Sequence, residues 1–106
     1  MIVVNRFRVP EVDVEAFRSD LERAHSTLAR GRGYLAGTVG RNVDDPTLWV
    51  LSTTWENVGS YRRALSSYDV KLNAVALLSR ALDEPSAFEV VGPDTVLNVG
   101  SPRSIG

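Results

Sequence analysis

The chain has no cysteine and only one histidine among its 106 residues. Without cysteine it can form no disulfide scaffold, thiolate nucleophile or zinc–thiolate cluster, and a single histidine cannot build a metal site from protein ligands alone. Nucleotide-binding and covalent-cofactor motifs are also absent from the sequence. We therefore expect no cofactor, so any chemistry must come from a shaped cavity that acts on a reactive ligand.

Strong charge and long apolar runs are lacking as well. The formal net charge is -1, which gives no electrostatic field for binding phosphate backbones or acidic membranes. The apolar run Ile2–Val4 is too short for a signal peptide, and no stretch approaches transmembrane length. We expect a cytoplasmic protein with no nucleic-acid partner and no membrane partner.

Hydrophobic periodicity predicts an alternation of strands and helices. A period of two residues indicates strands, and apolar residues three or four apart indicate helices. The Asp44-Asp45-Pro46 turn joins two of the strands as a hairpin, and Asn57 is suited to cap the second helical region. In chain order, the expected elements are a strand at 2–9, a helix at 14–28, strands at 34–41 and 47–55, a helical region at 57–82 broken at Ser66-Ser67, a strand at 88–91 and a short strand at 95–99.

This order, β-α-β-β-α-β plus a short C-terminal strand, is typical of the ferredoxin-like α+β fold. We expect one such domain over residues 1–99 and a loose tail at 100–106. The expected apolar stripe of the second helical region consists of Tyr61, Ala64, Leu65, Leu72, Val75, Leu78 and Leu82.

Both helices of this fold lie on one face of the sheet, which leaves the other face uncovered. That face would carry Ile2, Val4 and one row of the third strand, either Trp49, Leu51 and Trp55 or Val50. An uncovered apolar sheet face indicates an interface, so the sequence predicts a homodimer in which two sheets form a barrel. RNA-recognition motifs share the element order, but the basic Gly-aromatic motif with which they read bases is absent here.

Four segments carry a resemblance to a known family. They are Val4–Pro10, Arg32–Gly37, Thr53–Asn57 followed by Tyr61, and Glu84–Val91. In this order, and over nearly the whole chain, they resemble the antibiotic-biosynthesis monooxygenase family of small dimeric α/β-barrel proteins.

The resemblance implies one of two chemistries. Some members of the family oxidise phenolic polyketides such as anthrones to quinones without a cofactor. Trp55 and Tyr61 match a tryptophan and a tyrosine of that site, but Leu51 stands where those enzymes carry an asparagine. Val75 stands roughly where they carry an arginine.

Other members bind and degrade heme. Asn5 matches the asparagine that these proteins carry on the first strand. However, Ala64 falls at the position of their helical tryptophan and Asn73 at that of their axial histidine, so the resemblance argues against heme. Several members of the family have no known activity.

Asn5 is the most informative residue by its own pattern. It lies in the otherwise apolar row of Val3, Phe7 and Val9, where an unpaired buried amide costs roughly 1–3 kcal/mol. The amide needs a partner, which could be backbone, water or a ligand. The sequence favours neither a structural hydrogen bond nor a ligand contact as the partner of this amide.

Three aromatic residues and the histidine are further candidates. The indole N–H of Trp55 needs an acceptor, which a ligand carbonyl could provide, although a tryptophan at this place is more often a core residue. Tyr61 and Tyr68 could offer hydroxyls to a cavity or serve only in packing. His25 is the one side chain that titrates near neutral pH unaided, so it could act as a general base, or lie at the solvent edge.

The sequence thus leads to a cofactor-free oxygenase as the first hypothesis. Asn5, Trp55 and Tyr61 would line its cavity, with His25 as a candidate base, and the substrate would be an electron-rich phenol, hydroquinone or anthrone. The alternative is a non-catalytic module that binds a planar hydrophobic ligand, followed by heme binding without the usual ligand.

Overall fold

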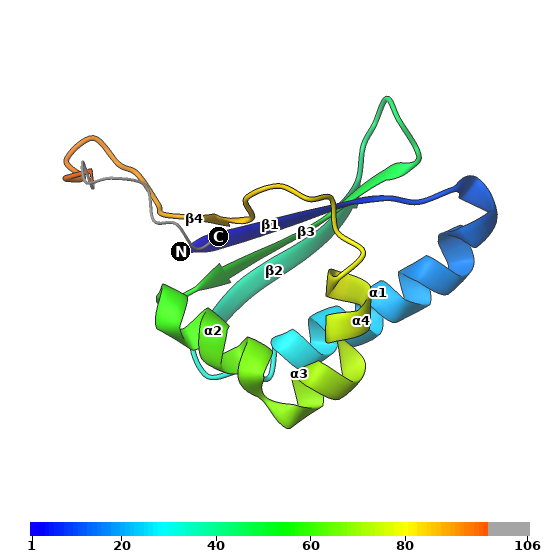
Figure 1. The fold of residues 1–106 in the computed structure, drawn as a ribbon. Coiled ribbons are helices and arrows are strands. Elements are labelled where there is room, and N and C mark those ends of the chain that lie inside the picture. The colour runs from blue at the N-terminus through cyan, green and yellow to red at the C-terminus, as the bar shows by residue number, and fades with distance from the viewer. Residues whose placement is uncertain (98–106) are drawn as a thin grey trace.

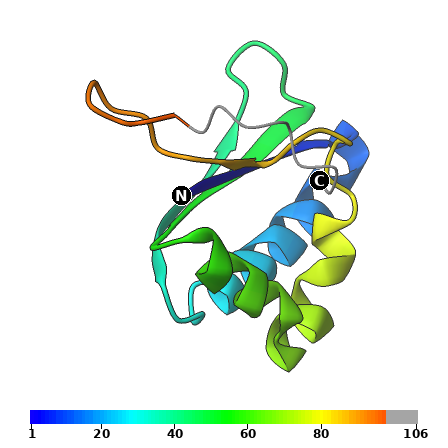
Figure 2. The same ribbon diagram turned by 60° about the vertical axis from the view of Figure 1, so that its left-hand side comes forward.

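The computed structural model describes residues 1–97 of the chain. Its elements are β1 (Ile2–Arg8), the 3-10 turn η1 (Glu11–Asp13), α1 (Val14–Leu28), β2 (Tyr34–Arg41), β3 (Leu48–Trp55), α2 (Val58–Ser66), α3 (Tyr68–Asn73), α4 (Val75–Leu78) and β4 (Ala87–Phe88). The sheet order is β2-β3-β1-β4, and all neighbouring strands are antiparallel. The helices gather on one face of this sheet (Figures 1 and 2). The predicted α+β, ferredoxin-like fold is confirmed.

The core lies between this sheet and the helices. Alternation along β3 buries Trp49, Leu51, Thr53 and Trp55 on the helix side, so the intervening Val50 faces the opposite side. The open face therefore carries Leu48 and Val50 with Ile2 and Val4, and the tryptophan row is not part of it. The buried apolar residues are Val3, Phe7, Val9, Phe17, Leu21, Ala24, Leu28, Trp49, Leu51, Trp55, Ala64, Val70, Ala74 and Leu77.

The second helical region is divided into three helices. Asn57 caps α2 as predicted, because its Oδ1 accepts the N–H of Ser60 at 2.8 Å. The expected break lies at Ser67, whose hydroxyl accepts the N–H of Val70 at 3.3 Å and so starts α3.

A second break at Ala74 has no cue in the sequence. Each break rotates the buried face of the next helix, so Leu72 is 65% exposed and Val75 39% exposed. Val70 and Leu77 are buried instead. The predicted apolar stripe was wrong at Leu72 and Val75.

Strand β4 is shorter than the predicted strand at 88–91. Phe88 pairs with Ile2 in an antiparallel register, so the residues after it run past the N-terminal end of β1 and find no partner strand. Farther along β1, the backbone is bonded by loop residues: Val4 N–H donates to Ser86 O at 2.7 Å, and Leu82 N–H donates to Arg6 O at 2.8 Å.

The predicted strand at 95–99 is only partly within the described residues. Thr95, Val96 and Leu97 do not belong to a strand, whereas Asn98, Val99 and the tail at 100–106 lie outside the described residues. The described part of this segment extends away from the sheet beyond the N-terminus (Figure 1).

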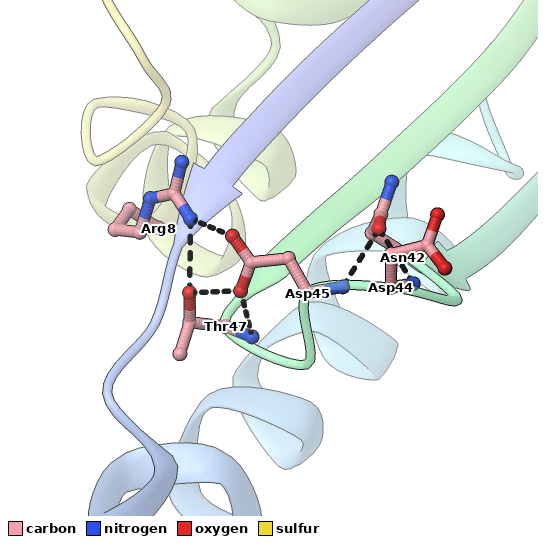
Figure 3. Close-up of polar contacts among 5 residues, drawn as sticks. All are labelled: Arg8, Asn42, Asp44, Asp45 and Thr47. Carbon is pink, nitrogen blue, oxygen red and sulfur yellow. Dashed lines mark hydrogen bonds and ion pairs between the residues drawn. The ribbon is translucent and has the colours of Figure 1, made fainter.

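The β2–β3 hairpin is closed by side chains (Figure 3). Asn42 Oδ1 accepts the N–H groups of Asp44 and Asp45, both at 2.8 Å. The Asp45 carboxylate accepts the hydroxyl and the N–H of Thr47, at 2.6 and 3.0 Å, and Nη1 of Arg8 at 2.5 Å. These hydrogen bonds, those of Thr47 foremost, lower the pKa of Asp45 to about 2. They tie the hairpin to the end of β1.

We expect this carboxylate to make stability depend on pH. Because its pKa is depressed in the folded chain, its contribution is present above the ordinary pKa of aspartate, about 3.9, and is lost as pH falls towards about 2. The urea midpoints of the chain and of Asp45→Asn should therefore converge as pH is lowered from 5 to 2. Asp44→Asn is the matched control because the Asp44 carboxyl takes no part in these bonds. Midpoints of the chain and Asp45→Asn that stay parallel would contradict this account.

Candidate functional site

Asn5 lies in the middle of β1 and faces the helices. Its neighbours in that row, Val3 and Phe7, are fully buried, whereas Asn5 is partly accessible. Across the sheet it pairs with Leu51, which is buried. Among residues 1–97, no hydrogen bond joins the Asn5 side chain to another protein group. Within the described chain the amide is therefore left to water or a ligand.

Asn5 lines a cleft between β1 and the segment that follows α4. The cleft has a volume of about 350 Å³, which lies at the lower end of the range of small-ligand sites, roughly 300–1,000 Å³. Leu78 and Leu82 contribute apolar surface, and Asn5 offers an amide donor and an amide acceptor. Most of the remaining lining is polar, so the arrangement suits a small ligand that carries polar oxygens on a small apolar body.

An ion pair holds the rim of this cleft. The Arg6 guanidinium donates two hydrogen bonds to the Glu84 carboxylate, at 2.7 and 2.8 Å. The hydrogen bond from Arg6 lowers the pKa of Glu84, and Glu84 in turn raises the pKa of Arg6. Both groups are solvent-exposed, so the pair orients the rim and adds little to overall stability.

Trp55 is 1% exposed, and its indole N–H is already bonded inside the protein. Nε1 donates to the Thr53 hydroxyl at 2.9 Å, so this N–H does not need a ligand acceptor. The Trp55 ring lies between Tyr34, at a centroid distance of 5.4 Å, and Tyr61, at 5.5 Å. Burial raises the pKa of Tyr61, which keeps its hydroxyl protonated near neutral pH.

His25 is half-buried, and its Nε2 lies 2.7 Å from the Tyr34 hydroxyl oxygen. Gly37 provides the room for this pair, since a Cβ there would overlap both His25 Nε2 and Tyr34 Oη. Burial raises the pKa of Tyr34, so the phenol stays neutral near pH 7. On its outer side, His25 borders a groove of about 550 Å³ between α1 and β2 that Trp49 and Arg41 also line.

The structure thus divides the predicted site residues into two groups. His25, Trp55 and Tyr61 join with Tyr34 in one chain of rings, whereas Asn5 lies apart. Trp55 is four residues from Leu51, the partner of Asn5, which corresponds to about 13 Å along a strand. Tyr68 is 76% exposed and belongs to neither group.

Sequence reasoning missed the role of Tyr34. The sequence feature that points to Tyr34 is its place directly after Gly33. The backbone of Gly33 has a φ of 90° and turns the chain from α1 into β2. The irregular register between Tyr34 and Ala36 then sets Tyr34 opposite Trp55.

The described residues also bear on metals, heme and membranes. In residues 1–97 no group of three or more His, Asp or Glu residues is placed to hold a metal ion. Asn73, which the resemblance places at the position of an axial histidine, donates its amide to Asp69 O at 3.1 Å. Over the same residues, no helix is both long and apolar enough to cross a membrane.

Comparison with known proteins identifies the class of this chain. The family model described as antibiotic biosynthesis monooxygenase matches residues 1–72, so the chain belongs to that family. None of the functionally curated proteins matches the chain significantly.

The solved structures include a cofactor-independent oxygenase, SnoaB from Streptomyces nogalater. A mutant of SnoaB is 30% identical, with 76% of this chain and 82% of that chain covered and a TM-score of 0.65. A second SnoaB structure is 26% identical, covers 89% and 96%, and has a TM-score of 0.70. A conserved protein from Methanosarcina mazei Go1 is 21% identical over 81% and 84%, with a TM-score of 0.66, and shares the fold.

The two asparagines Asn5 and Asn57 should respond in opposite ways to replacement by leucine. Among the described residues, Asn5→Leu leaves no protein partner unsatisfied, so the free energy of unfolding should stay the same or rise. Asn57→Leu removes the α2 cap and should cost roughly 0.5–2 kcal/mol. Urea denaturation of both variants is the measurement. A loss of roughly 1–3 kcal/mol in Asn5→Leu would make Asn5 a framework residue.

Proposed function

We propose that the protein is a cofactor-independent monooxygenase that oxidises an electron-rich phenol, hydroquinone or anthrone in the Asn5 cleft. The observation that carries this proposal is the Asn5 amide, which lines the cleft beside Leu78 and Leu82 and lacks a protein partner among the described residues. The similarity to SnoaB, a cofactor-independent oxygenase, supports the reaction class.

The cleft supplies what such a reaction needs from a protein. Asn5 Nδ2 donates to the substrate oxygen and stabilises the anion, while Leu78 and Leu82 pack against the apolar part of the substrate. The anion of an anthrone then passes one electron to O2, and the two radicals combine to a peroxide. Loss of water from the protonated peroxide gives the quinone. One oxygen atom enters the product and the other leaves as water.

A second candidate is a non-catalytic module that binds a planar hydrophobic ligand. The specific observation in its favour is Leu51, which is buried opposite Asn5 at a position where the resemblance implies an asparagine. One amide is enough to orient a ligand, and the amide that the resemblance implies for the oxygenases is missing at Leu51. The engagement of the Trp55 N–H by Thr53 points the same way.

Oxygen uptake with a panel of anthrones and hydroquinones separates the two candidates. We expect one O2 consumed per quinone formed, one labelled oxygen in the product from ¹⁸O2 and no released hydrogen peroxide. Asn5→Leu should lower kcat/KM by about 10- to 1,000-fold, in line with the loss of a hydrogen-bond donor to a developing oxyanion. Tyr68→Phe, on the exposed surface, is the control. Saturable binding without oxygen uptake above the protein-free rate would favour the binding module.

We also propose that two copies associate through the open face of the sheet. Ile2, Val4, Leu48 and Val50 lie on this face, and Phe88, paired with Ile2, extends it. The segment that follows β4 adds further exposed apolar side chains, namely Val90, Val91, Val96 and Leu97. On the β1–β3 ladder the apolar side chains alternate with Arg6, Arg8, Ser52 and Thr54. An open sheet face with exposed apolar side chains marks an interface, and its self-association would give a homodimer.

Sedimentation equilibrium at micromolar concentration should report about twice the chain mass of 11.6 kDa. Val50→Asp puts a charge in the middle of the proposed interface and should shift the chain to a monomer. Val43→Asp is the matched control, because Val43 is 96% exposed and lies in the hairpin loop. A single-chain mass for the unmodified protein would rule out this interface.

A further inference from the structure

Four rings form a continuous chain through one end of the molecule. In order they are Tyr61, Trp55, Tyr34 and His25, with centroid separations of 5.5, 5.4 and 6.0 Å. The central Trp55 is fully buried, while Tyr61, Tyr34 and His25 are partly accessible. These four rings include two of the three tyrosines, one of the two tryptophans and the only histidine of the sequence.

The two tyrosines differ in what surrounds their hydroxyl groups. Tyr34 Oη lies 2.7 Å from His25 Nε2, whereas the Tyr61 hydroxyl makes no hydrogen bond among the described residues. A neutral phenol that loses an electron becomes a strong acid, so it is oxidised readily only where a base can take its proton. The His25 imidazole, in hydrogen-bond contact with Tyr34 Oη, is positioned to act as such a base. Tyr34 is therefore the tyrosine that can lose an electron and a proton together and form a neutral tyrosyl radical.

We propose that Trp55, Tyr34 and His25 form a redox route that carries oxidising equivalents from the interior to the surface, with Tyr61 as a branch on Trp55. The physiological part rests on the proposed function, because the oxidant is a peroxyl radical formed when an aromatic radical escapes and adds O2. The route protects the interior because Tyr34 reduces the Trp55 radical before that radical reacts irreversibly. The resulting Tyr34 radical is then reduced at the surface.

Each step of the route balances in electrons and protons. The peroxyl radical takes one electron from Trp55 and becomes a hydroperoxide anion, which leaves a Trp55 radical cation. Tyr34 returns one electron to Trp55 and gives its phenolic proton to His25 Nε2. His25 releases that proton into the groove that it borders, which offsets the proton taken up by the hydroperoxide. A soluble thiol or ascorbate then restores Tyr34 by supplying one hydrogen atom.

A photochemical oxidant tests the route without any substrate. The full chain is illuminated with a ruthenium polypyridyl complex and persulfate, and radicals are followed by transient absorption and electron paramagnetic resonance. We expect a tryptophan radical that decays into a tyrosyl radical, and slower formation of the tyrosyl radical in D2O. Tyr34→Phe keeps the ring against Trp55 but should lower the tyrosyl yield severalfold. Tyr68→Phe and Trp49→Phe lie outside the route and should not lower it.

His25→Phe tests the proton acceptor separately. His25→Phe keeps an aromatic ring at this place, and a cooperative thermal melt would show that the variant is folded. If the role of His25 were purely structural, the folded variant would form the same radicals as the unmodified chain. We expect the tryptophan radical to live severalfold longer and the tyrosyl yield to fall. An unchanged tyrosyl yield in either Tyr34→Phe or His25→Phe would overturn the proposal.

Peroxyl radicals generated by a thermal azo initiator test the protective role. Peptide mass spectrometry should find severalfold more oxidised Trp55 in Tyr34→Phe than in the unmodified chain, and no such increase in Tyr68→Phe. Equal Trp55 oxidation in Tyr34→Phe and the unmodified chain would refute protection. Neither experiment requires turnover of a substrate. The redox route can therefore be confirmed or refuted even if the protein shows no oxygenase activity.

Discussion

The antiparallel register of β1 against β3 is the constraint on which both parts of the candidate site depend. Phe7 lies opposite Trp49, Asn5 opposite Leu51 and Val3 opposite Thr53. Partners in such a ladder point to the same face, so a slip of one residue would turn the whole central row towards the open side. The register is secured by burial, because that row carries the large side chains of the core. It also fixes Asn5 as the polar member of an apolar wall.

Much of the fold was predictable because its causes are local. The period of the apolar residues located β1, α1, β2 and β3, and the preference of asparagine for a cap located the start of α2. The length of β4 was not predictable in this way. It depends on where β1 begins and on the loop carbonyl of Ser86 that uses the β1 edge, which are tertiary facts. The break at Ala74 likewise has no local cue, and the helix that follows it buries Leu77.

The candidate site was predictable to a lesser degree. The acceptor of the Trp55 N–H is Thr53, two residues earlier on the same face of the strand, so the alternation in the sequence contained that answer. The grouping of His25 with Trp55 depends on Tyr34, which reaches both only because the backbone turns at Gly33 and the register shifts next to it. The local sequence does not determine whether Asn5 has a loop partner, because any residue of the loop after α4 could serve as its acceptor or donor.

The two faces of β1 couple the proposed cleft to the proposed dimer. Asn5 faces the helices and lines the cleft, and its neighbours Val4 and Arg6, which lie on the open face, line the cleft as well. The outer wall of the cleft is held to β1 by the backbone bonds of Leu82 and Ser86 and by the exposed pair of Arg6 and Glu84. An exposed ion pair contributes little in water, but a partner sheet packed over it would exclude solvent and strengthen the attraction. Association would then fix Arg6 and Glu84 in place, and through them the wall that faces Asn5. On this physical ground the cleft should be better ordered in a dimer than in a single chain.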